Sequence, residues 1–158
     1  MDALPLLNLP PFSPRLRREN GALRIFDPLR ERYVALTPEE WVRQHFVQML
    51  IEQLGYEPGL MGNEVSLRVG ALARRCDTVV YDSRLRPRMI VEYKRPSVAL
   101  SQRVFDQISR YNRTLRVPFL TVSNGLQHFC LRIDYDRETY TFLPAIPTWQ
   151  ELTTEAAT

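Results

Sequence analysis

Three residues in the middle of the chain have the types and the spacing that metal-assisted chemistry needs. Asp77 lies in one short apolar stretch, and Glu92 and Lys94 lie two residues apart near the end of the next. Side chains two residues apart in a strand point to the same face, so we expect Glu92 and Lys94 to project together. If the two stretches pair as a hairpin, Asp77 lies close to Glu92. The sequence thus predicts two carboxylates and one amine at one end of a sheet.

Such a group of side chains fits a divalent cation. Two crowded carboxylates resist joint ionisation unless a cation lies between them, and oxygen ligands suit Mg²⁺ or Mn²⁺. The ion would activate a water molecule and stabilise charge on a phosphoryl oxygen. We therefore predict Asp77 and Glu92 as metal ligands and Lys94 as the catalytic amine, which orients the water, accepts its proton or neutralises the transition state. The structural alternative is a surface ion pair between Glu92 and Lys94, which contributes little.

Lys94 is also unusual in the composition of the chain. It is the one lysine among 21 basic residues, and the others are arginines. Arginine stays charged at ordinary pH, whereas a buried or crowded lysine can lose its proton. Retention of lysine at this position favours a chemical role, and chance in an arginine-rich composition is the alternative.

Other polar residues offer accessory groups with two readings each. Gln107 and Tyr111 are four apart on a predicted helix and so share a face; they either reach the site or stay at its solvated rim. Glu40 is either the capping-box residue of the first helix or a third acid of the site. Two sets of arginines either contact phosphates or are solvated surface charge: Arg84, Arg86 and Arg88 around the hairpin turn, and Arg15, Arg17 and Arg18 near the N-terminus.

The elements that position these residues follow from hydrophobic periodicity and turn signals. Thr37 and Pro38 begin a helix, and Gly55 ends it. A second helix is predicted over 101–115, and strands over 64–69, 75–81, 88–94, 117–122, 127–133 and 138–142. The second helix connects two strands and therefore implies a parallel pair. The predicted fold class is α/β (α+β), with a mixed central sheet flanked by helices.

Composition indicates one globular domain of 158 residues with 44% hydrophobic and 25% charged residues. We expect a Pro/Arg-rich arm over 1–36 with one short strand at 23–26, a folded domain over 37–145 and a tail over 146–158. No apolar run approaches the roughly 20 residues of a membrane span, no secretory signal opens the chain, and two cysteines are too few for a disulfide framework. A cytoplasmic protein without a membrane partner is expected. The net charge of +3 permits a nucleic-acid partner.

Taken together, several segments resemble a known family. These are 37–44, 77–82, 91–96, 107–111 and 121–125, within a span of about 37–133. They are similar to the N-terminal nuclease domain of type I restriction enzyme R subunits, in the PD-(D/E)xK nuclease superfamily. The resemblance implies a restriction-endonuclease-like core, a Mg²⁺ site and hydrolysis of DNA phosphodiester bonds. It also implies roles by position: metal ligands Asp77 and Glu92, catalytic Lys94, an accessory pair Gln107 and Tyr111, and the first-helix acid Glu40.

The resemblance also suggests which partners and which activity to expect. The chain has no G-x-x-x-x-G-K motif for nucleotide binding, so we expect a free-standing version of the domain. DNA is the expected partner, with a homodimer or a separate motor or specificity chain as further partners in restriction-modification. One alternative is a catalytically silent nuclease-fold module that binds nucleic acid or protein. Another is a small α/β domain of different function, such as an oligomeric scaffold.

Overall fold

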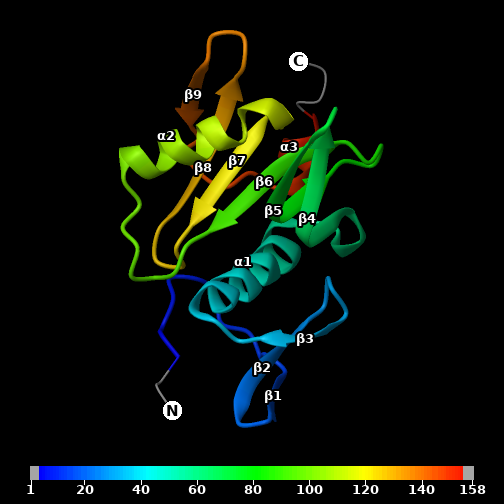
Figure 1. Cartoon of the computed structure of the whole chain (residues 1–158), viewed down its shortest axis with the longest axis vertical. Helices are drawn as coiled ribbons and strands as arrows, with labels where there is room; N and C mark the ends of the chain where they lie inside the picture. Colours follow the sequence, from blue (N-terminus) through cyan, green and yellow to red (C-terminus); the bar gives the residue numbers. More distant parts are fainter. Residues whose placement is uncertain (1–3, 155–158) are drawn as a thin grey trace.

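The computed structural model describes residues 4–154, which form two β-sheets with one long helix between them (Figure 1). The smaller sheet is antiparallel and comprises β1 (Leu16–Glu19), β2 (Ala22–Asp27) and β3 (Arg32–Ala35). The helix α1 (Pro38–Leu54) follows it and lies against the larger sheet. No helix within residues 4–154 is long and apolar enough to cross a membrane.

The larger sheet has six strands in sequence order, β4 to β9. They are β4 (Met61–Val69), β5 (Leu72–Tyr81), β6 (Pro87–Tyr93), β7 (Phe119–Ser123), β8 (His128–Asp134) and β9 (Thr139–Phe142). Neighbours pair antiparallel except β6 and β7, which are parallel and are connected through α2 (Gln102–Tyr111). The mixed sheet and its parallel pair are therefore confirmed. Two short 3₁₀ helices complete the connections, η1 (Pro58–Leu60) and η2 (Arg113–Leu115).

Hydrophobic clusters cover both faces of the larger sheet. On one face, Phe46 of α1 and Val91 of β6 belong to a buried cluster that also contains Leu152 of α3 (Trp149–Thr154). On the other face, Phe105 of α2 packs with Ile90 of β6. The adjacent residues Ile90 and Val91 thus point to opposite faces, as strand alternation requires. Glu92 follows Ile90 on the α2 face, and this placement sets the surroundings of the candidate site.

The predicted ends of α1 are confirmed. Thr37 is the N-cap, and its Oγ1 accepts a hydrogen bond from the Glu40 N–H at 3.0 Å. Gly55 ends the helix in the left-handed region at φ 76°, where glycine has no steric penalty. The capping box is formed in one direction, because the Glu40 carboxylate accepts from Arg30 and Gln44 instead of turning back toward Thr37.

The N-terminal segment differs from the extended arm that the sequence predicted. Residues 16–35 form the three-stranded sheet, and Ile25 and Asp27 are fully buried. Asn20 and Gly21, both at positive φ, make the tight turn between β1 and β2. An Asn-Gly pair is a strong hairpin signal because both residues adopt positive φ at low cost. The arm prediction gave weight to the nearby prolines and overlooked this turn.

The C-terminal segment is also more ordered than a polar tail. The helix α3 buries Leu152 completely. The Tyr56 hydroxyl donates to the Pro147 carbonyl at 2.8 Å, and the Arg88 guanidinium donates to the Leu152 carbonyl at 3.1 Å. The segment up to residue 154 is therefore part of the fold, and the rest of the proposed tail lies outside the described residues.

Candidate functional site

Asp77 and Glu92 lie side by side where β5 separates from β6. The last paired residues of the two strands at this end are Thr78 and Val91. One residue further, Asp77 Oδ2 accepts the N–H of Tyr93 at 2.9 Å, so a side chain replaces the main-chain bond of the ladder. The Asp77 carboxylate therefore lies in the fork between the strands, where it hydrogen-bonds with Glu92. The structure brings together the two acids that the hairpin prediction placed close to each other.

The surroundings of Glu92 oppose its ionisation. Burial is the largest cause, and the negative charge of Asp77 and the hydrogen bond to it add to the effect, raising the pKa of Glu92 to about 8. The charge of Lys94 and a hydrogen bond with Asn112 act in the opposite direction and are weaker. Within the part of the chain that the structure describes, Glu92 Oε1 is buried without a hydrogen-bond partner. A buried acceptor without a partner is costly, and a cation between the two carboxylates would relieve this cost.

The two carboxylates fit a hard divalent cation. Mg²⁺ in proteins is commonly bound by one or two carboxylates and keeps several water molecules. Among residues 4–154, no group of three or more His, Cys, Asp or Glu side chains could hold a metal ion. Asp77 and Glu92 would be the carboxylate ligands, and water molecules would complete the coordination.

Lys94 continues β6 by one residue and lies on the same strand face as Glu92. Its N–H donates to the Ser123 carbonyl at 2.9 Å, which holds the backbone against the end of β7. The side chain is half-buried, and its charge lowers the pKa of Glu92. No carboxylate of residues 4–154 lies within ion-pair distance of its ammonium group. The amine is thus near the carboxylate pair and is not fixed by an ion pair of its own.

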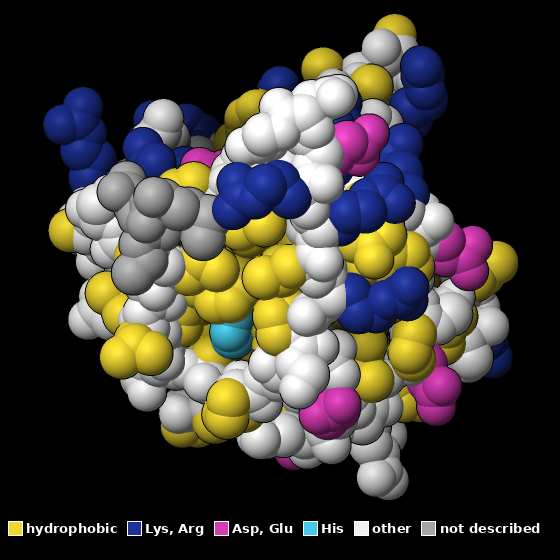
Figure 2. Space-filling view, turned by 90° about the horizontal axis from the view of Figure 1, so that it is seen from below, with side chains coloured by type: hydrophobic (Ala, Val, Ile, Leu, Met, Phe, Trp, Pro, Cys, Tyr) yellow, Lys and Arg dark blue, Asp and Glu magenta, His cyan; other side chains and the backbone are white. Residues whose placement is uncertain are grey.

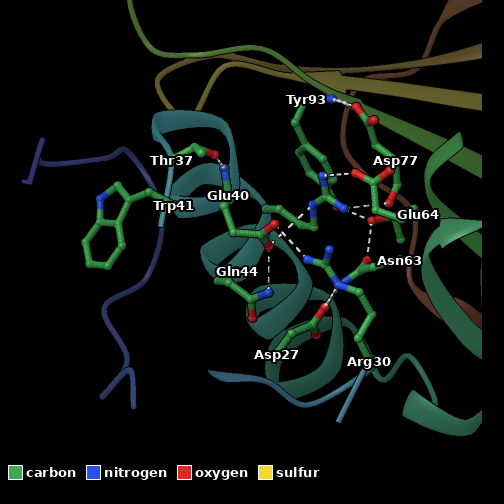
Figure 3. A network of polar contacts seen from close by, with 12 residues as sticks. Asp27, Arg30, Thr37, Glu40, Trp41, Gln44, Asn63, Glu64, Asp77 and Tyr93 are labelled. Carbon is green, nitrogen blue, oxygen red and sulfur yellow. Dashed lines mark hydrogen bonds and ion pairs between the residues drawn. The ribbon is translucent and has the colours of Figure 1, made fainter. Parts of the chain in front are cut away.

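Glu40 takes part in a buried network beside the acid pair (Figure 3). Its carboxylate accepts from Arg30 at 2.7 Å and from Gln44 at 2.9 Å. Arg43 lies between Glu40 and the site, with its Nε 3.5 Å from Glu40 Oε2 and its Nη1 donating to the Asp77 carbonyl at 3.2 Å. Glu40 is therefore connected to Asp77 through a guanidinium.

Arg43 is a residue of this site that the sequence analysis missed. Its side chain is buried, and besides contacting Asp77 it donates to Glu64 Oε1 at 2.7 Å. It fixes the main chain of Asp77 from the α1 face, while the Asp77 side chain turns into the fork. Its only sequence signal was a charged residue among the apolar residues of α1, such as Val42 and Phe46.

A second part of the network ties the small sheet to the same strands. Asp27 accepts from Arg30 and from Asn63 Nδ2. Asn63 in turn accepts from the Thr78 hydroxyl at 2.7 Å, and that hydroxyl lies 2.9 Å from the Tyr93 hydroxyl. The residues that follow Asp77 and Glu92 in their strands are therefore held by one buried hydrogen-bond chain that begins in β2.

The accessory pair occupies the C-terminal half of α2. The Tyr111 ring lies under the guanidinium of Arg74 in β5, with 4.4 Å between the guanidinium carbon and the ring centroid. The next residue, Asn112, is buried and hydrogen-bonds with Glu92. Gln107 lies one turn earlier on the exposed side, in a hollow shared with Arg103 and other polar residues. The structure places Tyr111 at the rim of the site and Gln107 on the adjacent solvent face.

The three arginines of the β5–β6 turn lie at the other end of β6 from Glu92. Arg86 pairs with Asp82 at 2.9 Å, and Arg84 is exposed. Arg88 is buried and holds α3, as described above. The structure thus does not bring these arginines to the carboxylate pair, and their contact with DNA stays a prediction.

The fold has a counterpart among solved structures. The fragment structure of a chain assigned as an HsdR subunit of a type I restriction enzyme from Vibrio vulnificus YJ016 matches with a TM-score of 0.53 and 23% sequence identity. The match covers 75% of this chain and 25% of that chain, so this chain spans about a quarter of its length. At this identity the likeness shows the fold, a restriction-endonuclease-like core, and supports no residue roles.

Comparison with protein families shows the family to which this chain belongs. No curated protein matches the chain. The family model described as "Type I restriction enzyme R protein N terminus (HSDR_N)" matches residues 38–147, which run from the start of α1 past β9 and include the carboxylate pair. This match covers more than half of the chain. The chain therefore belongs to the family of type I restriction enzyme R protein N-terminal domains.

Proposed function

We propose that this domain is a Mg²⁺-dependent endonuclease that hydrolyses phosphodiester bonds of DNA. The observation that carries the proposal is the pair of carboxylates, Asp77 and Glu92, in the fork between β5 and β6. Two such acids in a buried place resist joint ionisation, and a cation between them would allow both to ionise. Membership in a family of restriction enzyme domains supports a nuclease over other reactions that use such a pair.

Each residue of the site has a separate role in this proposal. Asp77 and Glu92 would hold the ion, and Glu92 would release its proton on binding it. An ion held there would polarise a water molecule and offset charge on the phosphoryl oxygen. Lys94, with an amine free of ion pairs to residues 4–154, orients the attacking water, accepts its proton or neutralises the developing charge. Arg43 keeps the main chain of Asp77 in place from the α1 side.

The wider context of the reaction is part of the same proposal. The solved relative is a subunit of a type I restriction enzyme, and we infer that this domain acts on DNA in restriction-modification. It would do so as a homodimer, or with a separate chain that supplies motor or specificity functions. Mn²⁺ would serve in place of Mg²⁺, since both prefer oxygen ligands.

The test is cleavage of linear, circular and single-stranded DNA in Mg²⁺ or Mn²⁺ by the wild-type chain and two Lys94 variants. Lys94→Ala should lose cleavage and keep metal binding, measured by calorimetry, because both carboxylates remain. Lys94→Arg separates two roles, since arginine keeps the charge and cannot accept a proton. Residual cleavage by this variant would assign charge neutralisation, and complete loss would assign proton transfer.

Two further variants give the controls. Asp77→Ala should lose both metal binding and cleavage, whereas Arg95→Ala, at an exposed position beside Lys94, should retain both. Cleavage by Lys94→Ala at the wild-type rate would refute the assigned role of the lysine. If no form cuts any DNA while the wild type still binds it, the catalytically silent binding module becomes the better description.

A further inference from the structure

The outer face of the sheet β1–β3 carries arginines that lie on aromatic rings. The Arg15 guanidinium lies 4.3 Å from the ring centroid of Phe26, and the Arg17 guanidinium lies 4.1 Å from that of Tyr33. The two rings contact each other edge to face, with 5.3 Å between centroids. Both arginines are exposed. Stacking holds each guanidinium plane in place, so less side-chain entropy is lost when its N–H groups bind a ligand.

Strand alternation places these side chains on one face of the small sheet, and Arg15 and Phe26 of this face also line a hollow with Gln48 and Glu52 of α1. Ile25 and Asp27 of β2 are fully buried, and Asp27 accepts a hydrogen bond from Asn63 of β4. Phe26, between them, points the other way and pairs with Tyr33 of β3, while Arg17 of β1 is opposite Arg24 of β2. The sheet lies at the lower end of the molecule in Figure 1, and Figure 2, seen from below, shows basic side chains (dark blue) beside apolar ones (yellow).

The positive charge of the chain is concentrated in this segment. Residues 15–35 contain six arginines and three acidic residues, so they alone account for the net charge of +3. Asp27 is buried and paired with Arg30. Glu19 is shared between Arg17 at 3.0 Å and Arg24 at 3.5 Å. No carboxylate within residues 4–154 lies in ion-pair distance of Arg15. The exposed face therefore has an excess of positive charge.

We propose that this face, defined by Arg15, Arg17, Arg24, Phe26 and Tyr33, binds the phosphate backbone of duplex DNA. Guanidinium groups match phosphate oxygens with two parallel N–H bonds. One face of the Phe26 ring and one face of the Tyr33 ring are covered by guanidinium groups, so these faces do not offer stacking platforms for unpaired bases of the kind that single-strand binders use. The contact is therefore with phosphates, independent of base sequence.

This surface would hold DNA at a place other than the carboxylate pair. It lies before residue 38, outside the segment that the family model matches. The choice of DNA as the ligand rests on the proposed function, but binding to phosphates here needs neither the metal nor Lys94. DNA binding through β1–β3 can therefore be tested separately from cleavage.

The test measures binding of a short fluorescent DNA duplex by anisotropy, in EDTA, over a series of salt concentrations. Each lost phosphate contact lowers the slope of log K against log salt by about one. Arg15→Ala/Arg17→Ala should therefore reduce this slope by about two and weaken binding at low salt. Arg15→Lys/Arg17→Lys, which keeps both charges, should retain most of the slope.

A matched pair of arginines controls for net charge. Arg68→Ala/Arg137→Ala removes two exposed arginines, one near the end of β4 and one between β8 and β9, and should leave the slope unchanged. The β8–β9 connection lies at the end of the molecule opposite β1 and β2 (Figure 1). Equal slopes for the wild type and Arg15→Ala/Arg17→Ala, or an equal loss in both double variants, would overturn the proposal. If the wild type cuts DNA and Arg15→Ala/Arg17→Ala keeps the wild-type salt slope, only the proposed binding surface is refuted. If the double variant loses the salt slope but the wild type cuts no DNA, only the proposed nuclease activity is refuted.

Discussion

The ionisation of Glu92 gives the candidate site a pH signature. Burial and the neighbouring Asp77 raise the pKa of Glu92 from 4.5 to about 8. Between these values the folded chain keeps a proton that the unfolded chain has released. The stabilising contribution is complete below the unfolded pKa and is lost as pH rises through the folded pKa. We predict that the free energy of unfolding, measured with urea in EDTA, falls across this window by at most about 1.4 kcal/mol per pH unit.

Glu92→Gln is the control for this titration. Glutamine has nearly the same shape and no titrating proton, so the dependence on pH over this window should largely disappear. Addition of Mg²⁺ to the wild type should also flatten it, because a cation between two carboxylates favours the ionised forms. An unchanged dependence in Glu92→Gln would mean that another group is responsible.

At the scale of single residues, the sequence could predict contacts that arise from local pairing. Asp77 and Glu92 meet because they belong to consecutive strands of one hairpin. Arg43 could not be predicted, because its contact with Asp77 joins residues 34 apart and depends on how α1 packs on the sheet. Asn112 escaped notice for the same reason, since only the end of α2 brings it to Glu92.

At the scale of elements, Arg43 and Arg75 pair with the same carboxylate, that of Glu64, but differ in burial and in the elements that they connect. Arg43 and Arg75 each donate to Glu64 at 2.7 Å, but the Arg43 side chain is 5% exposed and the Arg75 side chain is 70% exposed. Removing one partner of a buried ion pair leaves an uncompensated charge. Arg43 also joins α1 to β4 and β5 through Glu64 and the Asp77 carbonyl.

We therefore predict that Arg43→Met lowers the free energy of unfolding by about 3–5 kcal/mol, whereas Arg75→Met lowers it by less than about 1 kcal/mol. Chemical denaturation of the two variants beside the wild type measures both. Similar losses in the two variants would show that burial of the Arg43 network contributes no additional stability.

Helices and strands were predicted correctly from the sequence where a hydrophobic pattern extends over many residues. They were missed where only a turn motif indicates them. The 17-residue helix α1, with its Thr37 cap and Gly55 stop, was predicted closely. The parallel pair of β6 and β7 followed from the connection through α2. The strands β1 and β3 have four residues each, too few for an alternation to be recognised, and the Asn20-Gly21 turn indicated only β1.

At the scale of the whole molecule, segments from both ends of the chain support the same sheet. The small sheet holds β4 and β5 through the contacts of Asp27 and Asn63. The helix α3 packs in the same hydrophobic cluster as α1 and β6. The candidate site lies on the opposite face, at Glu92 of β6. The terminal segments therefore support the strands that carry the site from the face opposite to Glu92.

Leu152 tests this dependence on the C-terminal segment. It is fully buried against the cluster that contains Phe46 and Val91, so Leu152→Ala should lower the free energy of unfolding by about 2–5 kcal/mol. Leu6, which is 93% exposed, provides the matched control, and Leu6→Ala should change it by less than about 0.5 kcal/mol. Urea denaturation measures both variants. If α3 were only loosely attached, Leu152→Ala would unfold at the same urea concentration as the wild type, because no cavity would form in the core of the sheet.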